Sequence, residues 1–154
     1  MTYTVYSPRP RPRIAALRCR QLVTLILITN GLWDAVSATC IFWGRCGWLS
    51  RIHLNILSAG DIYVELLAVN MVGYWVLTNG CIRLLAGFHE DIGVEAAAFV
   101  TYIVEGMAFV LAATGSGSGR GNWVAVASFA CAIGVGLRTW ARCSTRRVFP
   151  TEPV

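Results

Sequence analysis

Four long apolar runs constrain this chain more than any other feature of its sequence. They cover about residues 21–43, 62–86, 92–114 and 123–142. A helix needs roughly 20 residues to cross a bilayer core, and none of the runs shows the period-two alternation typical of strands. We therefore predict an all-α integral membrane protein, a bundle of four transmembrane helices with both termini on the same side.

The composition agrees with a membrane location. Of the 154 residues, 56% are hydrophobic and 14% are charged, and the mean hydropathy is +0.58. Soluble domains average about 25% charged residues. These values disfavour a soluble enzyme, a disordered chain and a nucleic-acid-binding domain.

The segments outside the runs are polar. Residues 1–20 form a Pro/Arg-rich tail that we expect to be extended, and residues 143–154 form a polar C-terminal tail. A tight turn is predicted at 87–91 and a flexible Gly-Ser linker at 115–122. The longer connection at 44–61 has apolar residues at a spacing that predicts a short helix lying on the membrane surface.

The basic residues gather near the two ends of the chain. The net charge is +5, and every basic residue is an arginine. Seven of them are candidates for contact with lipid headgroups or partner proteins: Arg9, Arg11, Arg13, Arg138, Arg142, Arg146 and Arg147. The positive-inside rule places both termini in the cytosol, or in the matrix if the membrane is mitochondrial.

Charged residues inside the runs need a partner, because an unpaired charge is costly in a bilayer. Arg83 lies three residues before the end of its run and Glu95 three residues into the next. Across an antiparallel hairpin the two are level, so we predict a structural ion pair between them. Arg138 is expected at a similar depth and can join this pair.

Asp34 and Glu105 each lie thirteen residues inside their runs, near the middle of the membrane. No arginine is level with them when depth is counted along each run. Three interpretations stay open. The carboxyls are protonated and hydrogen-bonded to Asn30, Asn70, Thr101 or backbone groups; or they face a partner subunit that supplies a cation or hydroxyl; or they carry protons or line a ligand cavity.

The sequence offers no set of residues for a cofactor. Both histidines, His53 and His89, lie between the apolar runs, so the helices hold no axial ligand for haem. No cysteine cluster accompanies them to hold zinc, and the glycine-rich segment does not follow a strand as a phosphate loop would. We expect no catalytic residue, cofactor or metal, and we expect bound lipids.

Rows of small residues indicate close helix packing. Gly31 and Ala35 form one row, and Ser128, Ala132 and Gly136 form another. Such rows let helices approach closely. They serve either the packing of this chain on itself or its docking against another membrane protein, and both uses are compatible.

One segment resembles a known family. Residues 73–83, with the sequence Gly-Tyr-Trp-Val-Leu-Thr-Asn-Gly-Cys-Ile-Arg, are similar to a Gly-x-Trp-x-Leu…Ile/Val-Arg segment of the four-helix ergosterol-biosynthesis scaffold family. The stretch from Thr101 to Glu105 resembles that family's third helix, and the resemblance covers about residues 62–142. It implies a non-catalytic protein that holds sterol-synthesis enzymes together in the endoplasmic reticulum. Trp75, Arg83 and Glu105 would then be structural or docking residues.

Three functions follow from these observations. The first is a non-catalytic scaffold or accessory subunit of a larger membrane assembly, such as a respiratory or other energy-transducing complex, with integral membrane proteins and lipids as partners. A complex of this kind would hold the N-terminal tail and the Gly-Ser linker in place. As the location of the protein, it favours the mitochondrial inner membrane over the endoplasmic reticulum. The second is the sterol-enzyme tether. The third is a small enzyme or proton-linked carrier that uses Asp34 and Glu105, which a polar cavity joining these two residues would favour.

Overall fold

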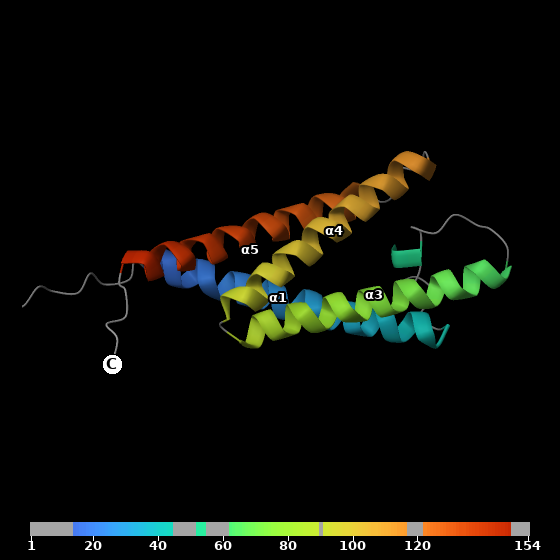
Figure 1. The fold of residues 1–154 in the computed structure, drawn as a ribbon, viewed down its shortest axis with the longest axis horizontal. Coiled ribbons are helices and arrows are strands. Elements are labelled where there is room, and N and C mark those ends of the chain that lie inside the picture. The colour runs from blue at the N-terminus through green and yellow to red at the C-terminus, as the bar shows by residue number, and fades with distance from the viewer. Residues whose placement is uncertain (1–13, 45–51, 55–61, 90, 117–121, 149–154) are drawn as a thin grey trace, which may run out of the picture.

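The computed structural model describes residues 14–44, 52–54, 62–89, 91–116 and 122–148, and these residues are helical almost throughout, with no strand among them. Figure 1 labels four long helices: α1 (Ile14–Phe42), α3 (Ile62–Phe88), α4 (Ile92–Ser116) and α5 (Asn122–Val148). A short helical turn at 52–54 lies between α1 and α3 in the chain. The all-α prediction is therefore confirmed.

Three of the helices are long and apolar enough to cross a membrane. The spans are Arg18–Phe42 in α1, Ile92–Thr114 in α4 and Trp123–Ser144 in α5. The sequence predicted a fourth span at 62–86, and the structure does form a helix there. That helix, α3, is not one of these three spans, and it carries the polar residues Glu65, Asn70, Asn79 and Arg83.

The helices associate as two pairs. α1 packs mainly against α3, and α4 packs mainly against α5. Figure 1 shows the two pairs close together at the end that holds the α3–α4 turn and further apart toward the other end. A buried apolar cluster joins α1, α3, α4 and α5 near the first end, with Leu27, Ala86, Ala98 and Val135 at its centre.

Local sequence signals mark the start of α4 and the end of α1. Asp91 begins α4 as an N-cap, since its side chain accepts a hydrogen bond of 3.0 Å from the backbone N–H of Val94. Glu95 follows in the first turn, where a negative charge interacts favourably with the helix dipole. Gly44 lies just beyond α1 with a φ of +62°, the left-handed conformation common after the end of a helix.

The small-residue rows are used inside the molecule. A Cβ added at Gly31 would lie 2.9 Å from the backbone oxygen of Gly80, so α1 and α3 touch almost backbone to backbone. Gly136 lies against the side-chain ring of Phe99 on α4. Ala132 is buried in the apolar cluster, and Ser128 is buried beside Glu105. Packing of the chain on itself therefore accounts for the predicted rows.

Several predicted boundaries differ from the structure. Helix α1 begins at Ile14, so residues 14–20 are helical rather than part of an extended tail. Helix α5 continues to Val148, into the predicted polar tail. Arginines are compatible with such extensions, because an arginine has an apolar stem and a charged end that can reach water. The rest of both tails, most of the 44–61 connection and the middle of the Gly-Ser linker lie outside the described residues.

Candidate functional site

The centre of the molecule holds an arginine that bridges two carboxylates from different helices. Arg83 on α3 donates from Nη1 to Oδ2 of Asp34 on α1, at 2.5 Å, and from Nη2 to Oε2 of Glu105 on α4, at 2.7 Å. All three side chains are buried, and Arg83 is only 1% exposed. Ion pairs with hydrogen bonds of this kind are needed to offset the cost of burying charge.

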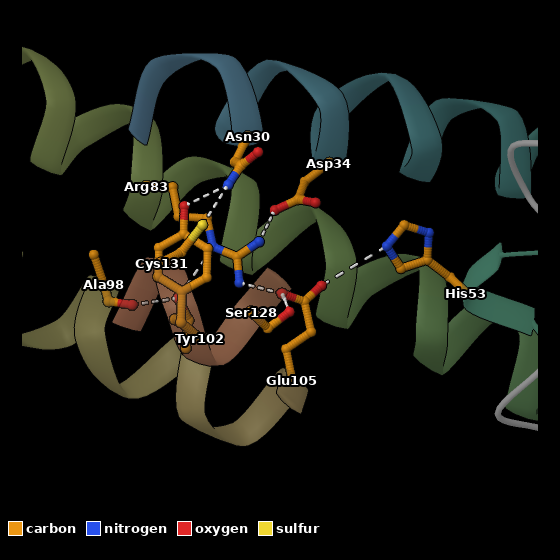
Figure 2. A network of polar contacts seen from close by, with 10 residues as sticks. Asn30, Asp34, His53, Arg83, Ala98, Tyr102, Glu105, Ser128 and Cys131 are labelled. Atoms are coloured by element: carbon orange, nitrogen blue, oxygen red, sulfur yellow. Dashed lines mark hydrogen bonds and ion pairs between the residues drawn. The ribbon is translucent and has the colours of Figure 1, made fainter. Parts of the chain in front are cut away.

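Further polar groups complete this central network, as Figure 2 shows. Nε of Arg83 donates to the Thr101 hydroxyl at 3.3 Å, and the guanidinium lies 3.9 Å from the centre of the Tyr102 ring. The Ser128 hydroxyl on α5 donates to Oε2 of Glu105 at 3.1 Å. Asn30 on α1 donates to the Tyr102 hydroxyl at 3.0 Å. The network thus connects all four long helices.

The predicted Arg83–Glu95 ion pair is wrong. The prediction compares the depths of residues in the membrane and takes every helix to begin at the same level. In the structure, α1 and α3 are offset along their length. Gly87, next to the last residue of α3, lies against Ile28 in the middle of α1. Arg83 is therefore close to Asp34, and its side chain extends along α4 toward Thr101 and Glu105.

Glu95 instead forms a second ion-pair cluster with α5. Nη2 of Arg138 lies 3.0 Å from its Oε1, and Arg142 donates a hydrogen bond to the same oxygen. Arg138 also donates to the Thr24 hydroxyl on α1 at 2.7 Å. Arg138 was expected at this depth, so its contact with Glu95 is confirmed. Arg142, a candidate for contact with lipid or a partner, thus has a contact inside the protein.

The structure also revises the interpretations offered for Asp34 and Glu105. The cation beside them comes from Arg83 of the same chain, so no partner subunit is needed to supply it. The third interpretation, that these carboxylates line a cavity, is correct as to geometry. A cavity of about 300 Å³ is lined by Asp34, Glu105 and Arg83 together with apolar residues of α1 and α5.

His53 is a site residue that the sequence analysis set aside. It lies in the short helical turn at 52–54, is 2% exposed, and places Nε2 3.9 Å from Oε1 of Glu105. Figure 2 shows its ring facing the second oxygens of Asp34 and Glu105, those that do not contact Arg83. A signal for this burial was present, because His53 stands between Ile52 and Leu54 in a connection that is apolar for a loop.

Asp34, His53 and Glu105 together offer three atoms that can bind a metal, all within 4.8 Å of one another. The sequence analysis expected no metal because the histidines lay far from any cysteine. Two carboxylates and one imidazole are nevertheless a donor set that divalent cations use. Arg83 opposes such an ion, since its positive charge already contacts both carboxylates.

Among the remaining predicted residues that the structure describes, Trp75 does not line this cavity. Trp75 on α3 is partly buried against the apolar cluster of Ala38, Ile41, Val72 and Val76. Its role is therefore packing between α1 and α3. Arg9, Arg11 and Arg13 lie outside the described residues, and the side chains of Arg146 and Arg147 are likewise undescribed.

Fold and site together define an all-helical protein with three helices able to cross a membrane and a charged network buried between them. No protein-family model, curated protein or solved structure matches the chain. The similarity of residues 73–83 to the sterol scaffold family stays an expectation from sequence.

Proposed function

We propose that this chain is a non-catalytic integral membrane protein that acts as a scaffold or accessory subunit in a larger membrane assembly. The observation that supports it best is the position of Arg83, which binds both carboxylates buried at the centre. Groups that could otherwise act as an acid and a base are used to tie α1, α3 and α4 together. The Glu95 cluster does the same for α1, α4 and α5.

The proposed arrangement has four membrane spans, with α3 as the fourth. Polar residues lower the hydropathy of α3, and two of them, Asn79 and Arg83, are buried against other helices. Their exposure to lipid is therefore small. The start of α1 and the end of α5 are near each other, as the Arg138–Thr24 contact requires, and arginines gather there. This supports termini on one side, facing the matrix or the cytosol.

Large apolar side chains cover the outside of all four helices. Those more than half exposed on α1, α3, α4 and α5 include Leu22, Leu25, Leu67, Met71, Val100, Leu111, Val126 and Ile133. Soluble monomers rarely expose apolar surface on this scale. These faces suit lipid tails or the helices of partner membrane proteins.

Native purification from gently solubilised membranes, followed by mass spectrometry, tests this function. We expect stoichiometric recovery of other integral membrane proteins. Subunits of a respiratory complex would identify the mitochondrial inner membrane, and sterol-synthesis enzymes would identify the tether in the endoplasmic reticulum. A chain recovered alone or only as a homodimer contradicts the scaffold function.

The cavity favours a second candidate, a small membrane enzyme or proton-linked carrier that uses Asp34 and Glu105. Exchange of Glu105 for Gln separates the two functions, because Gln keeps the shape of the side chain but removes its charge. A carrier would lose transport completely while its complex stays assembled. A scaffold would show weaker assembly in proportion to its loss of stability.

A further inference from the structure

The cavity beside Arg83 has features that the scaffold function does not use. It encloses about 300 Å³, which is at the lower end of the range for small-molecule pockets. It reaches the surface of the protein, because two of its lining residues, Trp33 and Trp123, are 41% and 63% exposed. A molecule can therefore enter it from outside.

The charges around the cavity do not balance. With both carboxylates ionised, Asp34 and Glu105 carry a charge of −2, and Arg83 supplies +1. With His53 neutral, the described lining of the cavity has a net charge of −1. In an interior of low polarity, this deficit favours a ligand that carries a single positive charge.

The geometry provides acceptors for that charge. Arg83 donates hydrogen bonds to only one oxygen of each carboxylate, Oδ2 of Asp34 and Oε2 of Glu105. Oδ1 of Asp34 and Oε1 of Glu105 point instead toward His53 (Figure 2). The distance from Nε2 of His53 to Oε1 of Glu105 is 3.9 Å, too long for a hydrogen bond. One oxygen of Asp34 and one of Glu105 lie within 4.8 Å of each other, so a single N–H donor group can reach both carboxylates.

The rest of the cavity lining is mainly apolar and aromatic, with Asn30 and Ser128 as further polar residues. Ile52, Val124 and Ala127 contribute aliphatic surface, and Trp33 and Trp123 contribute rings. Indole rings attract organic cations through their faces. Most of the lining thus suits the hydrocarbon part of a ligand, and the acceptors lie at the buried end.

We propose that this cavity binds an amphiphilic organic monocation, a protonated amine attached to an apolar body. The ammonium group donates hydrogen bonds to Asp34 and Glu105, and the apolar body lies against Trp33, Trp123 and the aliphatic wall. A divalent metal ion fits less well, because it would give the site an excess positive charge next to Arg83. This inference does not depend on the scaffold function.

Equilibrium dialysis against the protein in phosphatidylcholine nanodiscs tests the proposal, with octylamine, octanol and octanoate as probes. The three share one chain and differ in charge, and empty nanodiscs correct for partition into lipid. We expect saturable binding of one octylamine per protein. Octanol and octanoate should bind at least roughly tenfold more weakly, the loss expected for one charge-assisted hydrogen bond. Equal binding of all three probes would overturn the proposal.

Three variants locate the binding. Asp34→Asn should weaken octylamine binding by roughly tenfold to a hundredfold. Glu95→Gln is the matched control, since it neutralises a buried carboxylate outside the cavity and should bind octylamine as the unmodified protein does. Ala127 lines the cavity and belongs to neither ion-pair cluster, so Ala127→Phe adds a ring to the lining and keeps the proposal testable if Asp34→Asn fails to fold.

Two further results would contradict the proposal. One is unchanged octylamine binding by folded Ala127→Phe, which would place the amine elsewhere. The other is saturable binding of Zn²⁺, lost in Asp34→Asn, without saturable binding of octylamine. That result would assign Asp34, His53 and Glu105 to a metal ion instead.

Discussion

At the scale of single residues, Arg83 decides how the buried charges are arranged. Its planar guanidinium presents several N–H groups in fixed directions, so one side chain can serve Asp34, Glu105 and Thr101 at once. A lysine has a single ammonium on a flexible stem and lacks this geometry. Arg83 thereby makes two carboxylates tolerable in an interior that would otherwise strongly disfavour them.

Replacement of Arg83 by Met should therefore be strongly destabilising. Asp34 and Glu105 would be left facing each other without a cation. Removal of one partner from a buried ion pair costs about 3–5 kcal/mol. Unfolding in mixed micelles with increasing SDS, followed by circular dichroism, measures this loss.

A triple variant provides the control for this prediction. Arg83→Met combined with Asp34→Asn and Glu105→Gln removes all three charges together. Because neutral groups are much cheaper to bury than unpaired charges, the triple variant should recover most of the stability. If the single variant unfolds at the same SDS fraction as the unmodified protein, the network does not stabilise the fold.

The ion-pair partners of Arg83 could not be predicted from the sequence. Positions along a helix give depth only when the helices begin at a common level, and α1 and α3 do not. Residue types were still informative, since every intramembrane charge singled out from the sequence is part of an ion pair in the structure. His53 was missed because the fold of a connecting segment depends on contacts distant in the sequence.

At the scale of helices, the α1–α3 contact depends on glycine. A Cβ added at Gly80 would lie 2.9 Å from Cβ of Asp34 and 3.0 Å from the backbone oxygen of Gly31. Neither neighbour can move without moving its helix. Gly80→Ala should therefore separate α1 from α3 and cost about 1–3 kcal/mol, the usual range for overpacking. The same SDS titration measures this cost.

Gly134 on α5 is the matched control for Gly80. A Cβ added there would meet only a side-chain methyl of Val23, at 4.0 Å, which is an ordinary contact. Alanine is the better helix former by up to about 1 kcal/mol. Gly134→Ala should therefore be neutral or slightly stabilising. Equal destabilisation by both substitutions would contradict the prediction, because the close approach of the helices at Gly80 has no counterpart at Gly134.

The helices themselves were largely predictable, because long apolar runs leave few alternatives to a helix. The ends of the helices were less predictable. Arg142 was expected to be the last residue of its helix, yet α5 continues six residues beyond it. Its ion pair with Glu95 holds that region against α4, and such a contact is not visible in a one-dimensional pattern of hydropathy.

At the scale of the whole molecule, two helix pairs are held together by two ion-pair clusters. The central network joins α3 to α1 and α4, and the Glu95 cluster joins α5 to α1 and α4. The pairs separate toward the end away from the α3–α4 turn (Figure 1). Charge thus fixes how the pairs are joined, while the apolar outer surface is left for lipid or partners.

Whether α3 crosses the membrane determines the topology of the whole protein. Cys19 lies near the start of α1 and is exposed, and Cys143 lies near the end of α5 and is half-buried. With four spans these two cysteines are on the same side of the membrane. If α3 does not cross, the chain spans three times and they are on opposite sides.

Single-cysteine variants decide between these topologies. In sealed vesicles of one orientation, a membrane-impermeant maleimide should label the variants retaining only Cys19 or only Cys143 to the same extent. Both should react before permeabilisation, or both only after it, according to the side on which the arginine-rich end lies. Labelling of one before and the other only after permeabilisation would exclude α3 as a span. Arg83 would then be held in the molecule by its ion pairs alone, on a helix that packs against the spans without crossing the bilayer.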